Sequence, residues 1–497
     1  MSTSPSPYPD KALDSAHLES AGASALEPEH AAYLIQRHGT VDLIPLPSAD
    51  PKDPLNWPTW KKNTQILMVA FHAMMTTFTA AAVLPAFIPF AKLYEISVTK
   101  ATYLTSVQIL FLGVFPLLWC PLASRYGRRP ILLASVLGSF ATNMGGAWCT
   151  SYGTQMTTRA LTAICISPAL GIGGAVATEL FFAHERAQKL GWWTLMTTLG
   201  TPGGPFIMGF VVQHIGVRWI FWILAIINFC QFLGYLLLGG ETLYPSHSDA
   251  ASSVPATKSP TLRRIDRTPL SLSAFYSPLL LVTKASVIVP SCAYAVVFCY
   301  ANIALLVETP VIFGEKFHLD AQQIGLQYIA LIIGSVIGEQ VSGPLSDFVQ
   351  RRHRKHSQGN PQHRASPTRR LWFSYVGFLT VFIGLIVWGV RVQHAKEGVW
   401  NVTPLVGAAI AAFGNQVITT TLIAYAVDCY RDRSMDIAVL VNFVRQVWGF
   451  IGPFYLPHMF ETLNLGPSAG LMCGIIAVFA LVPIMVLHWF ARNRNRE

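Results

Sequence analysis

The most informative shortage in this 497-residue chain is charge. Asp, Glu, Lys and Arg together make up 12% of the residues, whereas hydrophobic residues make up 52% and the mean hydropathy is +0.43. Soluble domains carry about 25% charged residues, so this composition excludes a soluble globular protein. The sequence predicts an all-α protein that crosses a membrane many times.

The sequence also lacks the common signatures of nucleotide-driven and metal-dependent chemistry. It holds no Gly-x-x-x-x-Gly-Lys-Ser/Thr loop for ATP and no Cys/His cluster with metal-ligand spacing. No nucleophile, base and orienting group fall within plausible reach of one another. We therefore expect no enzyme activity, no cofactor and no metal. Energy for any transport would have to come from an ion gradient.

Cysteine is scarce as well. All eight cysteines fall within or at the ends of apolar runs, a placement that indicates packing rather than a disulfide framework. The N-terminus begins Met1-Ser-Thr-Ser-Pro-Ser and lacks a charged region followed by an apolar core. We expect no cleavable signal peptide, so that the first apolar run itself directs membrane insertion.

Long apolar runs, in contrast, are abundant. Six precede the longest internal polar loop and six follow it, which predicts two six-helix bundles at 61–240 and 279–490. We expect a disordered cytoplasmic tail at 1–60, a cytoplasmic linker at 241–278 and a cytoplasmic tail at 491–497. Each run has about the 20 residues needed to cross a bilayer, and the runs lie near 64–90, 102–124, 131–150, 156–180, 190–213, 218–239, 279–307, 324–347, 371–393, 402–428, 436–460 and 467–490.

The net charge of +10 comes from loops between the apolar runs. Lys and Arg gather in alternate loops, most densely at 349–370, which follows the positive-inside rule and places both termini in the cytoplasm. We expect the 349–370 loop to contact anionic lipid of the inner leaflet and expect no nucleic-acid partner. The plasma membrane is the default location, with a vacuolar or other organelle membrane as the alternative, and we expect a monomer.

One helix-end device occurs twice, about half a chain apart. Cys120-Pro-Leu-Ala-Ser124-Arg-Tyr-Gly-Arg-Arg129 and Gly343-Pro-Leu-Ser-Asp347-Phe-Val-Gln-Arg-Arg352 each end an apolar run with an arginine pair. Related membrane bundles within one chain are typical of secondary transporters. The candidate cytoplasmic gate comprises Ser124, Arg125, Gly127, Arg128, Arg129, Gly343 and Asp347, with Gly127 permitting a tight turn.

The fifth run concentrates glycine and proline inside an apolar segment. Small residues let helices approach closely, and proline loosens the helical hydrogen-bond ladder so that the helix can bend. The alternative is an ordinary packing helix. The predicted bend motif consists of Gly200, Pro202, Gly203, Gly204, Pro205 and Gly209.

Three charged residues are predicted deep in the membrane, where charge is costly and usually functional. Arg159 in the fourth run should face a cavity rather than reach to the surface. Glu339 and Arg445 lie at matching depth, so they could form an ion pair that opens when a proton or substrate arrives; a fixed structural pair is the alternative. Six polar residues could also line the pathway, with a hydrogen bond to a neighbouring helix as the alternative: Gln108, Tyr300, Asn302, Asn415, Gln416 and Gln446.

These features resemble the major facilitator superfamily, and within it the fungal twelve-span drug:proton antiporters. The first helix-end device is similar to the family pattern Gly-x-x-x-Asp-Arg-x-Gly-Arg-Arg, with Cys120 and Ser124 at the glycine and acidic positions. Gly204-Pro205-Phe-Ile-Met-Gly209 is similar to the antiporters' proline–glycine motif. Further likeness lies in Asp53-Pro-Leu-Asn-Trp-Pro58, Glu179-Leu-Phe-Phe-Ala-His-Glu-Arg186 and Val441-Asn-Phe-Val-Arg-Gln-Val-Trp-Gly-Phe-Ile-Gly-Pro453.

The resemblance implies two bundles that alternate around a central site. It also implies that an acid in the gate motif holds the halves together. Ser124 lacks this acid, so Asp347 is the candidate for the gate charge, with a simple helix-end charge as the alternative. We expect proton-coupled efflux of a small organic molecule: a secondary metabolite, an organic acid or a xenobiotic. The two deep arginines, Arg159 and Arg445, favour a substrate that carries a carboxylate. The alternatives are proton-coupled uptake of a nutrient, vitamin or polyamine, and a non-transporting membrane sensor.

Overall fold

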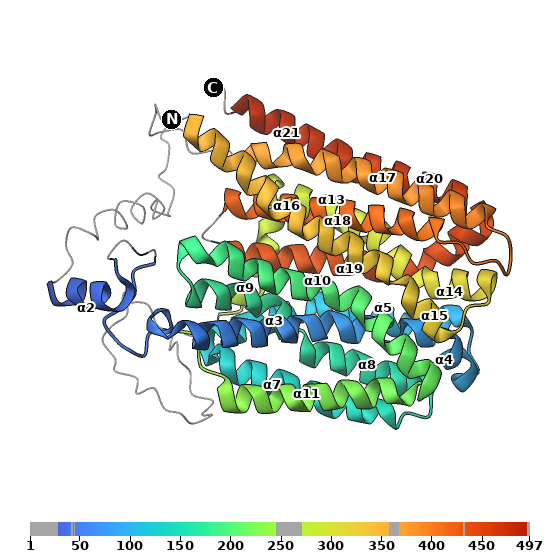
Figure 1. Ribbon diagram of the computed structural model, residues 1–497, viewed down its shortest axis with the longest axis horizontal. Coiled ribbons are helices and arrows are strands. Elements are labelled where there is room, and N and C mark those ends of the chain that lie inside the picture. Colours follow the sequence, from blue (N-terminus) through green and yellow to red (C-terminus); the bar gives the residue numbers. More distant parts are fainter. Residues whose placement is uncertain are drawn as a thin grey trace, which may run out of the picture.

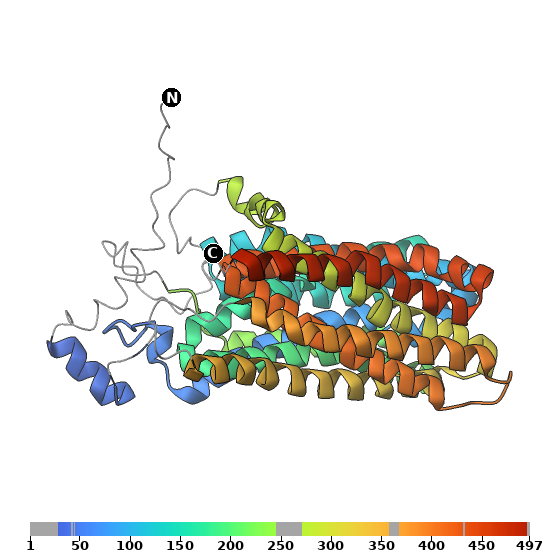
Figure 2. The ribbon, with the colours of Figure 1, turned by 90° about the horizontal axis from the view of Figure 1, so that it is seen from above.

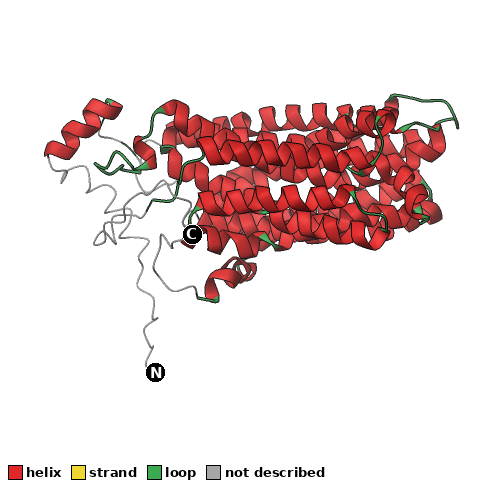
Figure 3. Ribbon diagram, turned by 90° about the horizontal axis from the view of Figure 1, so that it is seen from below, coloured by secondary structure: helices red, strands yellow, loops and turns green. Residues whose placement is uncertain are grey.

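The computed structural model describes residues 28–40, 43, 45–244, 271–356, 367–430 and 433–494. Within these residues every regular element is helical (Figure 3). Eleven helices are long and apolar enough to cross a membrane, or twelve when the bent pair α5 (Val98–Val114) and α6 (Pro116–Tyr126) counts as one span. The predicted all-α membrane fold with twelve apolar spans is confirmed at this level.

The first six spans use nine helices because three of the spans are broken. The helices in chain order are α3 (Thr59–Ala81) and α4 (Phe87–Tyr94) in span one, α5 and α6 in span two, α7 (Arg128–Ala147), α8 (Tyr152–Ile166) and α9 (Pro168–Leu180) in span four, α10 (Ala183–His214) and α11 (Arg218–Leu238). Two of these breaks precede a proline, Pro116 and Pro168. Proline has no backbone N–H to give to the preceding turn, so a new helix starts there.

The second half begins with a short helix, α12 (Ser273–Leu280), before six further spans. Residues 245–270 of the predicted cytoplasmic linker lie outside the described residues. The spans are α13 (Ala285–Phe298), the π-helix η6 (Cys299–Ala304) and α14 (Leu305–Phe317) in span seven, α15 (Ala321–Gln327) and α16 (Ile329–His356) in span eight, α17 (Leu371–His394), α18 (Thr403–Cys429), α19 (Ser434–Leu463), and α20 (Leu465–Ile476), the π-helix η9 (Ala477–Leu481) and α21 (Val482–Arg494) in span twelve.

The two halves lie side by side. Helices coloured blue to green occupy the lower part of Figure 1, and those coloured yellow to red occupy the upper part. The halves meet along α5 with α19 and along α10 with α15 and α16. Helix α2 (Pro28–His38) and the last turn of α21 lie at one end of the bundle, called the terminal end here, while α4, α14 and α15 lie at the far end (Figures 1 and 2).

Burial distinguishes the central spans from the peripheral ones. Span seven is mostly buried inside the protein, whereas span twelve is mostly exposed. Large apolar side chains on the outer faces are open, such as Leu237, Leu379 and Phe479. A soluble protein rarely exposes so much contiguous apolar surface, whereas hydrocarbon chains of a bilayer would cover it.

The segment before the first span is partly ordered, which corrects the expected disordered tail for the described residues between 28 and 60. Leu34 of α2 is fully buried in a small cluster with Leu43, Leu55 and Phe182. The Asp53 carboxylate accepts hydrogen bonds from the backbone N–H of Ser48 (2.8 Å) and of Leu55 (2.9 Å). Apolar burial and this buried turn together hold the segment against the terminal end of the bundle.

Candidate functional site

A central cavity lies between the two halves and encloses about 200 Å³. Its walls come from spans one, two, four and five of the first half and from spans seven, ten and eleven of the second. The cavity extends toward the terminal end as far as Ala438, in the first turns of α19. At the far end the halves touch, with His214 Nε2 2.8 Å from Gln322 Oε1 and the Tyr103 and Phe454 rings stacked at 4.6 Å.

Arg445 of α19 is the only charged side chain among the described residues that line this cavity. Its guanidinium donates to Tyr294 Oη (3.1 Å) and to Asn442 Oδ1 (2.8 Å), and it lies 4.7 Å from the ring centre of Phe298. Asn442 in turn donates to the carbonyl of Leu112 in the first half (3.0 Å). Aromatic faces and neutral acceptors therefore orient a cation that no carboxylate of the described residues neutralises.

Several polar atoms of the lining have no hydrogen-bond partner in the described structure. They include Oδ1 of Asn302, Oδ1 of Asn415, Nε of Arg445 and Nε1 of Trp193. Buried polar groups are normally satisfied, because an unmade hydrogen bond costs about 1–3 kcal/mol. Unsatisfied donors and acceptors from both halves around one cavity are what a substrate-binding site provides.

Glu339 does not form the suggested ion pair with Arg445. Its carboxylate instead accepts hydrogen bonds from the Gln416 amide (2.5 Å) and the Thr420 hydroxyl (3.2 Å). Gln416 lines the cavity and also lies 3.4 Å from the Thr198 hydroxyl of span five. Glu339 thus lies behind the cavity wall and is connected through one amide to the opposite half.

The other predicted pathway residues divide into two groups. Asn302, Asn415, Gln416, Arg445 and Gln446 line the cavity, whereas Gln108, Tyr300, Glu339 and Arg159 do not. The Tyr300 hydroxyl accepts a hydrogen bond from Tyr455 (2.9 Å), and both polar atoms of the Gln108 amide are buried without a partner. Spacing along a helix gives depth but not rotation about the helix axis, and only the rotation decides what a side chain faces.

Arg159 does not line the cavity, contrary to expectation, but binds backbone carbonyls of span one. Its guanidinium is 1% exposed and donates to the carbonyls of Thr79 (2.8 Å) and Ala80 (2.9 Å). These carbonyls belong to the last turn of α3, where the helix itself supplies no donors. Arg159 therefore caps the end of α3, where span one is broken. Its positive charge also interacts favourably with the negative C-terminal end of the helix dipole.

Helix α10 passes through Pro202 and Pro205 as one continuous helix, so the predicted bend motif acts here as a packing motif. A methyl group added at Gly200 would lie 2.3 Å from the carbonyl oxygen of Met74, and one at Gly204 would lie 2.7 Å from that of Phe78. Both glycines therefore seat α10 directly on the backbone of α3. Gly203 faces open space.

Gly209 brings the two halves together at the far end. A methyl group at Gly209 would lie 2.6 Å from the Ala321 carbonyl oxygen and 3.0 Å from the Gly325 Cα, and backbone atoms cannot rotate away. We expect Gly209→Val to separate α10 from α15 and so to disfavour this arrangement of the halves. Nitroxide labels at the exposed residues Gln213 and Leu326 measure the separation by electron spin resonance.

Gly203→Ala on the same helix is the matched control, because nothing lies within 4 Å of its added methyl group. The label-to-label distances should lengthen in Gly209→Val and stay unchanged in Gly203→Ala. Equal distance distributions in both variants would contradict a role for this backbone contact in closing the far end.

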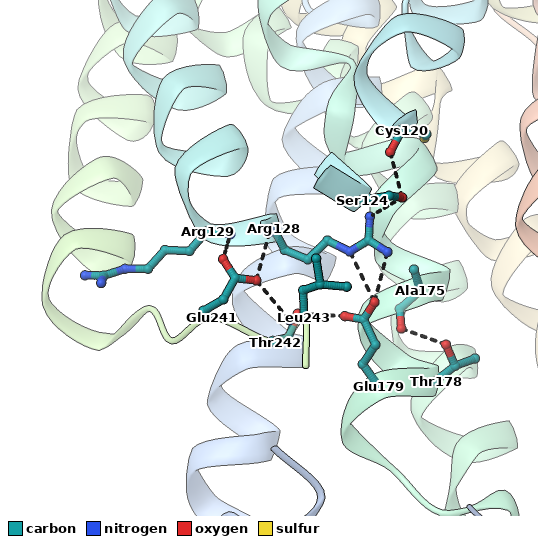
Figure 4. Close-up of polar contacts among 10 residues, drawn as sticks. All are labelled: Cys120, Ser124, Arg128, Arg129, Ala175, Thr178, Glu179, Glu241, Thr242 and Leu243. Carbon is teal, nitrogen blue, oxygen red and sulfur yellow. Dashed lines mark hydrogen bonds and ion pairs between the residues drawn. The ribbon is translucent and has the colours of Figure 1, made fainter. Parts of the chain in front are cut away.

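The first helix-end device forms a buried polar cluster within the first half (Figure 4). The Arg128 guanidinium contacts Glu179 Oε1 from Nη2 (2.9 Å) and Nε (3.2 Å), and Thr242 donates to the other oxygen of Glu179 (2.8 Å). Ser124 accepts from Arg128 at 3.4 Å and donates to the Cys120 carbonyl. The cluster ties the start of α7 to the end of α9 and to the segment after α11.

Glu241 completes this cluster by accepting hydrogen bonds from the backbone N–H groups of Arg128 (2.8 Å) and Arg129 (3.1 Å) at the start of α7 (Figure 4). A carboxylate is the favoured group at a helix N-terminus. Burial raises the pKa of Glu241, and the backbone N–H groups oppose that rise. Gly127, which joins α6 to α7, has φ +100°, and this confirms the tight turn that its position predicted.

The second half repeats the ion pair of the first. Arg370, just before α17, contacts Asp428 near the end of α18 at 2.8 Å, as Arg128 at the start of α7 contacts Glu179 near the end of α9. Gly343 lies within α16, and the side chain of Asp347 lies outside the described residues. The two halves therefore carry matching salt bridges, although Arg370 and Asp428 lie outside the second copy of the sequence motif.

Sequence reasoning missed the acidic partners in both halves. Glu179 lay in a segment that contributed to the family likeness, and Asp428 lay at the end of the tenth apolar run, but neither had a predicted partner. A signal was present, because each acid ends the span after the one that its arginine begins. Antiparallel neighbouring helices place such residues at the same end of the bundle.

Comparisons with known proteins agree with this architecture. Over 90% of the chain, it is 27% identical to "MFS-type transporter atr4" of Stereocaulon alpinum, 81% of which is covered. It is also 27% identical to "Efflux pump radE" of Floropilus chiversii, with 88% of the chain and 82% of that protein aligned. The crystal structure of the human organic anion transporter MFSD10 matches with a TM-score of 0.58 at 14% identity, covering 87% of this chain and all of that one.

The described fold and these relatives are consistent with a family-level match over most of the chain. The model of the Major Facilitator Superfamily matches residues 66–453, which run from span one into span eleven. This stretch contains most of both halves, the residues that line the central cavity and both of the matching salt bridges. The chain therefore belongs to the major facilitator superfamily and is a secondary transporter rather than an enzyme.

Proposed function

We propose that this transporter exports a small amphipathic organic molecule that carries an acidic group, in exchange for protons. The observation that supports this most directly is the central cavity, in which Arg445 is the one charged group among the described lining residues and most other walls are apolar, aromatic or threonine. A partly buried guanidinium with no carboxylate partner among the described residues favours an anionic ligand group. The apolar walls favour an attached hydrophobic body.

The direction of transport rests on two further observations. Relatives such as "Efflux pump radE" and "Efflux pump vrtL" of Penicillium aethiopicum bear the name of efflux pumps. The cavity extends toward the terminal end, which the positive-inside rule assigns to the cytoplasm. A substrate would then enter from the cytoplasm and leave when the far end opens.

A polyamine is a less suitable cargo for this cavity. "Polyamine transporter 3" of Saccharomyces cerevisiae is a relative at 21% identity over 92% of the chain. Among the described residues, however, no carboxylate lines the central cavity, and Arg445 would repel an ammonium group. Glu339 is our candidate for the group that couples a proton to substrate binding. Its carboxylate accepts a hydrogen bond from Gln416, and Gln416 itself lines the cavity.

The test uses inside-out vesicles and a panel of amphipathic organic acids, with and without an acidic lumen. Accumulation that requires the acidic lumen supports proton antiport, and we expect Glu339→Gln to lose most of this dependence because the amide cannot bind the proton. Accumulation without any dependence on the pH gradient would contradict antiport. If Glu339→Gln and the unmodified protein behave alike, Glu339 has no part in coupling.

A further inference from the structure

A second cavity opens at the far end of the molecule. It encloses about 690 Å³ between α5 of the first half and α14, α19 and the segment after α17 of the second half. Four carboxyl groups line it: Glu308, Glu315, Glu397 and Glu461. We call this space the outer acidic cavity.

Lys316 is the one basic side chain among the lining residues, and its charge is already engaged. The Lys316 ammonium donates to the carbonyls of Val392 (2.6 Å) and Gln393 (2.9 Å). No ion pair within the described residues joins it to a carboxylate of the cavity. The α5 wall adds Val98, Thr99 and Thr102, which do not titrate. The cavity therefore carries excess negative charge, which concentrates protons at its mouth.

Glu308 differs from the other three carboxyl groups in its burial. Glu315, Glu397 and Glu461 are exposed, whereas Glu308 is 2% exposed and its Oε1 is buried without a hydrogen-bond partner. An unpaired carboxylate inside a membrane span is costly and by default functional. An oxygen so fully covered is accessible to a proton but not to an ammonium group of ordinary size.

The same turn of helix separates the outer acidic cavity from the central one. Leu306 and Val307 line the central cavity, and the next residue, Glu308, lines the outer one. The π-helix η6 (Cys299–Ala304) directly precedes this turn and contributes Asn302 and Ile303 to the central lining. π-helical turns often occur at functional sites, because their wider hydrogen-bond ladder is easily rearranged.

We propose that Glu308 is the proton-binding carboxyl group through which this transporter takes up protons at its far end. The outer acidic cavity collects the proton, and neutralising Glu308 removes the cost of a buried charge beside the central lining. The state of span seven thereby depends on the proton supply at the far end. This inference rests on the proposed proton-coupled function and gives it a second, outward-facing group besides Glu339.

The first measurement is infrared difference spectroscopy of the purified full-length protein between about pH 5 and about pH 9, a range that brackets a perturbed carboxyl group. We expect Glu308→Gln to lose one carbonyl band of a protonated carboxyl group that the unmodified protein and Glu461→Gln both show. Glu308→Asp should retain a shifted band, which separates loss of the titrating group from misfolding. An unchanged difference spectrum in Glu308→Gln would overturn the proposal.

The second measurement is gradient-driven accumulation of the organic-acid panel in inside-out vesicles. In Glu308→Gln we expect accumulation with an acidic lumen to fall to the level seen without a gradient. In Glu95→Gln, which changes an exposed glutamate after α4 that lines neither cavity, we expect it to remain. If accumulation by Glu308→Gln still depends on the pH gradient, the proposed role of Glu308 is overturned, whereas proton antiport is not. If no variant or unmodified protein responds to the gradient, the exchange function fails, while the infrared band still decides whether Glu308 binds a proton.

Discussion

Replacing Arg445 by Ala should lower the transport rate of an acidic substrate by about tenfold to a hundredfold, which corresponds to one or two charge-assisted hydrogen bonds. The substitution removes the one charge of the described cavity lining. It also leaves the Tyr294 hydroxyl and the Asn442 amide without their donor. Initial rates of uptake into inside-out vesicles, at several substrate concentrations, measure the effect.

Two further variants show whether charge or geometry is responsible. Arg445→Lys keeps the charge but loses the planar fork that holds Tyr294 and Asn442 together, so we expect intermediate activity. Arg391→Ala, an exposed arginine in the last turn of α17, is the matched control and should transport normally. Equal rates for Arg445→Ala and Arg391→Ala would show that the central cation does not contact the substrate.

The largest stability effect is expected at Arg128. Its side chain is 5% exposed and that of Glu179 is 18% exposed, so Arg128→Ala leaves a mostly buried carboxylate without its cation. Breaking one side of a buried ion pair costs about 3–5 kcal/mol, and for a chain of this size we expect the thermal unfolding midpoint to fall by about 3–5 °C. Tryptophan fluorescence during heating in detergent measures the midpoint.

Arg129→Ala is the neighbouring control for this measurement. The Arg129 side chain donates one exposed hydrogen bond, to the Leu236 carbonyl at 3.1 Å, while its backbone N–H keeps its contact with Glu241. Its midpoint should change little. Replacing Arg128 and Glu179 together by Met and Leu should recover most of the loss, because no uncompensated charge remains. A midpoint for Arg128→Ala equal to that of Arg129→Ala would mean that the ion pair contributes no net stability.

The two expected effects concern different levels of the molecule. Arg128 and Glu179 join helices within one half, as Arg370 and Asp428 do in the other, so they preserve each bundle as a unit. Arg445 and its partner Asn442 lie where the halves face each other. Rigid bundles around a deformable central site are what alternating access requires.

The sequence alone determined the membrane class, the number and order of the spans, the repeated helix-end device and the turn at Gly127. These features depend on local properties: apolar length, loop charge and the φ +100° that glycine tolerates. Five of the nine predicted pathway residues line the central cavity for a similar reason, since polar groups inside apolar spans seldom face lipid.

Only the tertiary structure decided which deep charges meet. Glu339 and Arg445 have matching depth, but rotation of their helices gives them the separate partners Gln416 and Tyr294. Arg159 of span four binds carbonyls at the end of α3 in span one, and nothing in the sequence of span four predicts that contact. Glu308 escaped notice because the predicted seventh run ended at 307, where acidic residues lower the local hydropathy, whereas packing extends the helix to Phe317. Contacts between residues far apart in the chain depend on helix rotation and close packing, which no single segment specifies.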